Sequence, residues 1–77
     1  MPTRKPRLPP ELRELGAAIQ AQRQARGVTQ RDLARALGVS VAYVSLIERG
    51  RRNPPYTTVV ELARALSTTV ARLSDDQ

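Results

Sequence analysis

The sequence of 77 residues contains no cysteine and no histidine. Without cysteine, the chain forms no disulfide and offers no thiolate for catalysis. Without histidine, it lacks the commonest general base and the commonest metal ligand. It also lacks a nucleophile–base pair, a cluster of metal-ligating residues and a glycine-rich phosphate loop. We therefore expect no enzyme activity, no metal site and no cofactor.

Aromatic residues and long apolar runs are scarce as well. Tyr43 and Tyr56 are the only aromatic residues, which is too few for a stacking platform for single-stranded nucleic acid. No stretch approaches the ~20 apolar residues that a membrane span needs. The basic, proline-rich N-terminus is followed by no apolar run of the kind found in a secretory signal. We expect a cytoplasmic protein without membrane contact.

Positive charge, by contrast, is abundant. The formal net charge is +6, and twelve of the thirteen basic residues are arginine. The planar guanidinium group matches phosphate, so the charge balance favours a nucleic-acid partner. Arginine-rich codon usage in the source genome is the alternative explanation. The length of the chain allows one domain and not two.

Proline, glycine and hydroxyl residues divide the chain into segments. We expect residues 1–10 to form a flexible basic arm, because prolines at this density forbid helix, and residues 74–77 to form a tail too polar to pack. The domain between them, residues 11–73, has apolar side chains at helical spacing and no strand pattern, which predicts an all-α fold. The predicted helices run from Pro9 or Pro10 to Gly27, from Thr29 to Gly38, from Ser40 to Gly50, from Tyr56 or Thr58 to Leu66, and onward from Thr69.

Residues 30–49 carry the most specific pattern. Two short predicted helices are joined by a tight turn at Gly38, where the backbone needs a positive φ. Ala34 is placed where the helices cross, because its small side chain allows close approach. Apolar side chains fill the space between the helices: Leu33, Leu37, Val39, Val44 and Ile47. The outer face of the second helix stays free, as in helix-turn-helix proteins that insert this helix into the major groove.

The stretch TQRDLARALGVSVAYVSLIERGRRNP resembles the Cro/C1-type (XRE) family of helix-turn-helix proteins, which includes phage repressors and small bacterial regulators. LGAAIQAQRQARGVTQ resembles the first helix of the family and TVVELARAL the fourth, so the likeness covers roughly residues 12–73. It implies a compact five-helix, lambda-repressor-like domain from a bacterium or phage. It also implies a sequence-specific transcriptional regulator, most simply a repressor or autoregulator, that binds double-stranded DNA at a palindromic operator as a homodimer.

The resemblance also implies roles for single residues. DNA contacts fall at the start of the second helix, on the outer face of the third and in the loop after it: Gln30, Ser40, Val41, Ala42, Ser45, Leu46, Arg49, Arg51 and Arg52. Arg23 and Glu48 match an internal, structural ion pair between the first and third helices. Tyr43 has two interpretations: its hydroxyl reaches a DNA phosphate, or its ring covers the end of the first helix.

Other interpretations of these residues stay open. Gln30 is alternatively a solvated residue in the first turn of its helix. The three arginines of the loop are alternatively a solvated run of charges. Ser40 serves first as a helix cap, and this role is compatible with a DNA contact. The chain has Val41 and Leu46 where the family usually has polar residues. Leu46 cannot share the direction of its neighbour Ile47, so we expect it to be exposed. Such a face suits contacts to thymine methyl groups, or selection through DNA shape, better than polar base readout.

This chain departs from the family's usual residues at both ends of the fourth helix. It has Pro55 in place of a serine cap before the helix and Ser67 in place of a glycine after it. Other basic residues are weaker candidates for phosphate contact, and they lie in the arm and on the second helix: Arg4, Lys5, Arg7, Arg31 and Arg35.

A single domain makes few base contacts, so we expect a dimer that joins through Val70 and Leu73. The competing function is an antitoxin-like module that binds a partner protein through an apolar stripe of Val41 and Leu46, with Tyr43 as an optional third member.

Overall fold

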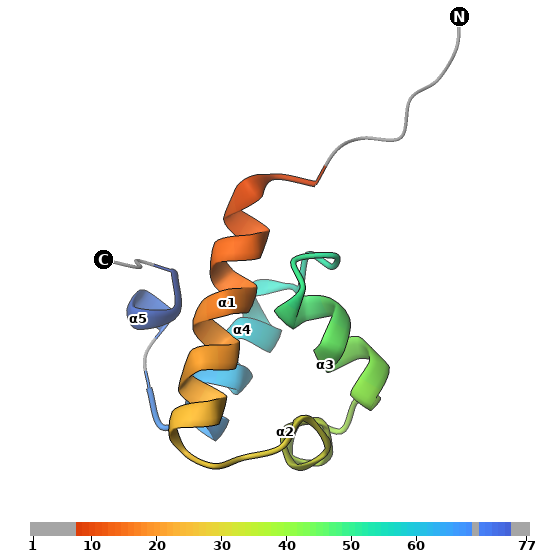
Figure 1. Cartoon of the computed structure of the whole chain (residues 1–77), viewed down its shortest axis with the longest axis vertical. Helices are drawn as coiled ribbons and strands as arrows, with labels where there is room; N and C mark the ends of the chain where they lie inside the picture. Colours follow the sequence, from red (N-terminus) through yellow and green to blue (C-terminus); the bar gives the residue numbers. More distant parts are fainter. Residues whose placement is uncertain (1–7, 69, 75–77) are drawn as a thin grey trace, which may run out of the picture.

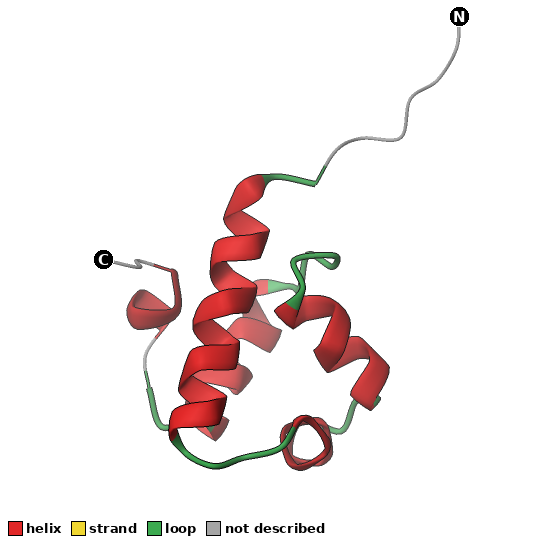
Figure 2. Cartoon of the chain, in the orientation of Figure 1, coloured by secondary structure: helices red, strands yellow, loops and turns green. Residues whose placement is uncertain are grey.

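The computed structural model describes residues 8–68 and 70–74. It contains helices α1 (Pro10–Ala25), α2 (Gln30–Leu37), α3 (Val41–Glu48) and α4 (Tyr56–Ala65), and a five-residue helix α5 (Val70–Ser74). This described part is all-α and has no strand, as predicted (Figure 2). The predicted arm up to residue 7, the cap at Thr69 and the tail from residue 75 lie outside the described residues. None of the described helices is both long and apolar enough to cross a membrane.

The helices are arranged around α1, which contacts α3 on one side and α5 on the other. The second helix contacts both α3 and α4, and α4 contacts α5. In Figure 1, α2 is seen end-on while α3 lies across the view, so the two helices meet at a steep angle. All five helices contribute to one buried cluster: Ile19, Leu33, Ala34, Val44, Ile47, Val59, Leu62, Ala63, Leu66 and Leu73. This cluster fixes α3 against the rest of the domain.

The ends of α2 and α3 are closed as predicted from the sequence. Thr29 and Asp32 form a capping box at α2: the Asp32 N–H donates to Thr29 Oγ1 at 3.0 Å, and the Thr29 N–H donates to Asp32 Oδ2 at 3.2 Å. Hydrogen bonding from Thr29, first through its backbone N–H, lowers the pKa of the Asp32 carboxyl below its ordinary value. Gly38 ends α2 with φ 71°, and Ser40 Oγ accepts the Tyr43 N–H at 3.0 Å. The turn between α2 and α3 is therefore stabilised by the glycine that ends α2 and by the serine cap that begins α3.

Ser67 follows α4 in the left-handed conformation, with φ 53°. It is the only described residue other than glycine with a positive φ. An L-residue with a β-carbon pays a steric cost there that glycine does not. The absence of the usual glycine at this position therefore leaves local backbone strain.

We expect Ser67→Gly to stabilise the domain by about 1 kcal/mol, which corresponds to a rise in Tm of about 4–8 °C. The matched control is Ser67→Ala, which also removes the hydroxyl but keeps the β-carbon and the strain. Thermal melts followed by circular dichroism compare the three proteins. A glycine variant that melts no higher than the alanine variant would show that the strain is absent.

Candidate nucleic-acid interface

The outer side of α3 is the surface that the fold leaves open. The inner side is fixed, because Val44 and Ile47 are each only 1% exposed. Ala34 of α2, 2% exposed, belongs to the same buried cluster, and the Val39 N–H donates to its carbonyl oxygen at 3.0 Å where the chain leaves α2. Tight packing of the inner side of a recognition helix is needed because it fixes the direction of the side chains on the outer side.

The predicted contact residues of α3 differ in exposure. Ser40 and Ala42 are exposed and Val41 is 40% exposed, whereas Ser45 is half-buried. The expectation that Leu46 is exposed is wrong, because this residue is half-buried. The chain turns back at this point, and the Arg51 N–H donates to the Leu46 carbonyl oxygen at 2.8 Å. The exposed outer face is therefore centred on the first turn of α3.

Three exposed arginines lie directly after this face: Arg49, Arg51 and Arg52. Arg49 folds back along the helix, and its Nε donates to the Ser45 carbonyl oxygen at 3.4 Å. The Arg52 guanidinium carbon lies 5.4 Å from the centre of the Tyr43 ring, within range of a cation–π interaction. Tyr43 is half-buried and packs against the core, so its ring supports Arg52. No pattern in the sequence indicates this pairing.

A buried polar network connects the interface to α1. Arg23 and Glu48 are paired as the family resemblance implies, with Nε donating to Oε2 at 2.7 Å and Nη2 donating to Oε1 at 3.1 Å. Arg23 Nη1 also donates to the Val28 carbonyl oxygen at 2.9 Å. The Gln30 amide, Nε2, donates to Glu48 Oε1 at 2.9 Å. Gln30 is thus half-buried and tied to α3 by one of the two hydrogens of its amide group.

Gly16 allows the closest approach between α1 and α3, and the sequence analysis missed it. A β-carbon at this buried position would lie 2.4 Å from the Ile47 carbonyl oxygen and 2.5 Å from that of Glu48. The signal was present, since a lone glycine inside a helical pattern often has a packing reason. Its position beside the end of α3 makes α1 the support of the interface.

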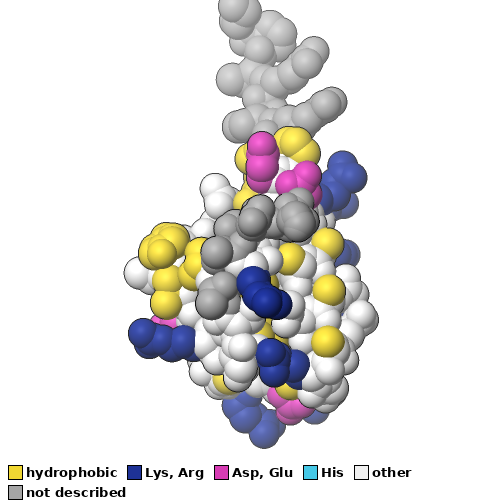
Figure 3. All heavy atoms as spheres, turned by 90° about the vertical axis from the view of Figure 1, so that its left-hand side faces the viewer, with side chains coloured by type: hydrophobic (Ala, Val, Ile, Leu, Met, Phe, Trp, Pro, Cys, Tyr) yellow, Lys and Arg dark blue, Asp and Glu magenta, His cyan; other side chains and the backbone are white. Residues whose placement is uncertain are grey.

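The predicted dimer residues need a correction. Leu73 is 1% exposed and belongs to the core, because α5 packs against α1 and α4, so this side chain has no surface to offer a second copy. Val70 is half-buried and lines a separate pocket of about 480 Å³ together with the acidic residues Glu11 and Glu14. On the face shown in Figure 3, acidic and hydrophobic side chains gather near the start of α1, and basic side chains lie apart from one another.

Comparisons with known proteins agree with this geometry. A helix-turn-helix family model matches residues 19–73. The chain is 42% identical over 57 residues to the HTH-type transcriptional regulator y4dJ of Sinorhizobium fredii, a match that covers 73% of this chain and 74% of the relative. Some relatives are longer: the matched region, 46% identical, spans 62% of this chain but 37% of the HTH-type transcriptional regulator DdrOP3 of Deinococcus deserti.

Two solved structures extend the likeness. The clp gene regulator ClgR of C. glutamicum superposes with a TM-score of 0.85 and 36% identity over 94% of this chain and 92% of that chain. The restriction-modification controller protein C.Esp1396I, solved as a tetramer in complex with its 35-base-pair operator, superposes with a TM-score of 0.75 and 26% identity over 86% of this chain and 87% of that chain. This chain belongs to the Cro/C1-type (XRE) family of helix-turn-helix, DNA-binding transcriptional regulators.

Proposed function

We propose that this chain binds double-stranded DNA in a sequence-specific manner and represses transcription, its own gene being the simplest target. In this proposal α3 enters the major groove and α2 crosses the DNA backbone above it. The observation that carries the proposal is the combination of a buried inner face of α3, a free outer face and a basic loop directly after it.

The proposed contacts fall into two kinds. Arg49, Arg51 and Arg52 position the protein by contacting phosphates, which gives affinity without sequence information. Selectivity comes from the first turn of α3, where the methyl groups of Val41 and Ala42 suit thymine methyl groups. The remaining contacts in this proposal are the exposed Ser40 and four half-buried residues: Gln30 through its second amide hydrogen, Tyr43, Ser45 and Leu46.

A homodimer on a palindromic operator is part of the proposal. One domain presents a short reading face, and two half-sites about one helical turn apart multiply the affinity. C.Esp1396I forms a tetramer on its operator, which supports an assembly of this type. In this proposal the domain covers about residues 11–73 in a five-helix, lambda-repressor-like arrangement, and the helices from α1, which begins at Pro10, to α5, which ends at Ser74, support it. Val70 remains the candidate interface residue beside Tyr56, which is 70% exposed.

The second candidate is a module that binds a partner protein in the manner of an antitoxin. One observation favours it: Val41 is a large hydrophobic residue with 40% exposure at the start of the outer face of α3. In that case the apolar first turn of α3 contacts protein and not bases. The basic loop then has no explanation, and for this reason we prefer DNA binding.

Selection of binding sites from a random duplex library tests the proposal. The affinity for the best sequence and for a scrambled control is then measured as a function of salt concentration. We expect a palindromic consensus, tight binding to it, and a log affinity that falls by about 0.9 per phosphate contact per log unit of salt. Equal and weak binding to all duplexes would reject sequence-specific regulation and favour the partner-protein function.

A further inference from the structure

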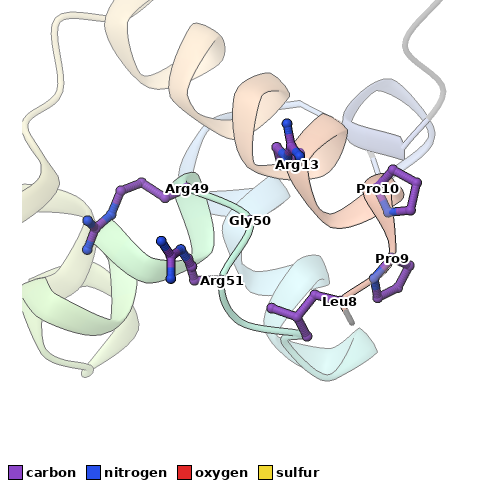
Figure 4. Close-up of a pocket in the computed structure, with 7 residues that line it drawn as sticks. All are labelled: Leu8, Pro9, Pro10, Arg13, Arg49, Gly50 and Arg51. Carbon is purple, nitrogen blue, oxygen red and sulfur yellow. The ribbon is translucent and has the colours of Figure 1, made fainter. Parts of the chain in front are cut away.

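Arg13, to which the family resemblance assigns no role, lines a pocket together with two arginines of the basic loop, Arg49 and Arg51. The pocket, about 410 Å³ in volume, lies between the start of α1 and the loop after α3 (Figure 4). Three arginines, two prolines, a leucine and a glycine line it: Leu8, Pro9, Pro10, Arg13, Arg49, Gly50 and Arg51. The lining is therefore cationic on the side of the arginines and contains no acidic residue.

Gly50 is the reason that these arginines meet. Its φ is +73°, and a β-carbon there would lie 2.8 Å from Arg13 Cα and 2.9 Å from the Arg13 backbone nitrogen. The loop after α3 can touch the backbone of α1 only because this residue has no side chain. In Figure 4, Gly50 lies between Arg13 on α1 and the pair formed by Arg49 and Arg51. Arg13 is thereby joined to the basic loop although it is distant in sequence.

The positive charge of this pocket is not neutralised within the described residues. Arg13 and Arg51 are exposed, and neither forms an ion pair or a side-chain hydrogen bond in that part of the chain. The nearest acidic residues in sequence, Glu11 and Glu14, line a different pocket on the side of α4 and α5. Like charges held together in one concavity attract an anion and raise its local concentration.

We propose that this pocket binds a backbone phosphate of duplex DNA and that Arg13 is a DNA-binding residue. The inference rests on the proposed function and deepens it, since the pocket continues the surface formed by Arg49 and Arg51. The arginine forks supply donors to the phosphate oxygens. The carbon atoms of Leu8 and Pro10 form an apolar wall suited to the adjoining deoxyribose. Because every nucleotide carries a phosphate, this contact adds affinity and no sequence preference.

The test compares Arg13→Gln with Arg64→Gln, which removes the same charge from an exposed position of α4 beside Glu61. Affinity for a fluorescent mixed-sequence duplex and for the duplex obtained by selection is measured over a range of salt concentrations. For Arg13→Gln we expect an affinity about tenfold weaker on both duplexes, and a salt slope smaller by about 0.9 for each protein chain bound. Arg13→Lys, which keeps the charge, retains the slope, and Arg64→Gln changes neither quantity.

A second readout uses the unaltered protein and does not depend on how a variant folds. The Nε–Hε resonance of Arg13 should shift when duplex is added, and that of Arg64 should stay in place. A slope for Arg13→Gln equal to that for Arg64→Gln, or an Arg13 resonance that does not respond, would overturn the inference while leaving the proposed function intact. A wild-type protein that binds no duplex at all would overturn both.

Discussion

Replacing Glu48 by alanine is expected to lower the free energy of unfolding by about 3–5 kcal/mol. Glu48 accepts hydrogen bonds from both Arg23 and Gln30, and the ion-paired side chains are 11% exposed for Arg23 and 2% for Glu48. Removal of the carboxylate leaves the Arg23 guanidinium out of water without a counter-charge, which costs far more than the loss of a surface ion pair. A domain of this size has a total stability of about 4–12 kcal/mol, so the variant should be close to unfolding.

Urea denaturation followed by circular dichroism measures this loss, and Glu61→Ala is the matched control. Glu61 lies exposed on α4, so its removal makes the same change in net charge with an effect within about 0.5 kcal/mol. In the double variant Arg23→Met, Glu48→Met no buried charge is left, and much of the lost stability should return. If the Glu48 and Glu61 variants unfold at the same urea concentration, the network has no structural role.

Replacing Gly16 by alanine should destabilise the domain by about 3 kcal/mol, because the new β-carbon would overlap the backbone of α3. The sign of the change in stability distinguishes the effect of packing between α1 and α3 from the effect of helix propensity. On propensity alone, alanine inside α1 would stabilise the helix by about 1 kcal/mol relative to glycine. The contact with the Ile47 carbonyl oxygen cannot be relieved by rotating a side chain, because the position of a β-carbon is set by the backbone of α1 and the oxygen belongs to the backbone of α3.

Thermal melting of the variant provides the measurement, with an expected fall in Tm of roughly 12–24 °C. Ala17→Gly is the neighbouring control: Ala17 is exposed, so this change reports propensity alone, at about 1 kcal/mol. A Gly16→Ala protein that melts at or above the wild-type temperature would mean that α1 and α3 are not in close contact.

Local chemistry explains why most of the fold could be predicted from the sequence. The helix caps at Thr29 and Ser40 and the turn at Gly38 depend on neighbouring residues, and all three adopt the predicted geometry. The spacing of apolar residues identified the inner faces of α2 and α3 for the same reason. Such signals require no knowledge of how distant segments meet.

The features that escaped prediction all depend on contacts between distant segments. Gly16 and Gly50 are ordinary glycines in the sequence, and only the packing of α1 against the end of α3 shows what each one allows. Leu73 was expected at a dimer interface, yet α5 packs against α1 and α4 and this side chain is buried. Arg13 resembles any charged residue in a first helical turn until Gly50 places it beside the basic loop.

The central claim, that the free face of α3 contacts DNA bases, is tested most directly by placing a negative charge on that face. Ala42→Glu alters the exposed first turn of α3, and Ala36→Glu alters an exposed alanine of α2 that lines a pocket with residues of α4. Both variants carry the same charge change, and affinity for the selected duplex is measured for each at 0.1 M salt. A glutamate held against the DNA costs several kcal/mol, so we expect Ala42→Glu to bind about 100-fold or more weakly. Ala36→Glu should stay within about threefold of the wild type, because Ala36 lies on the side of α2 that faces α4, and salt screens a charge that does not contact the DNA. Equal binding by the two variants would contradict the placement of α3 in the major groove.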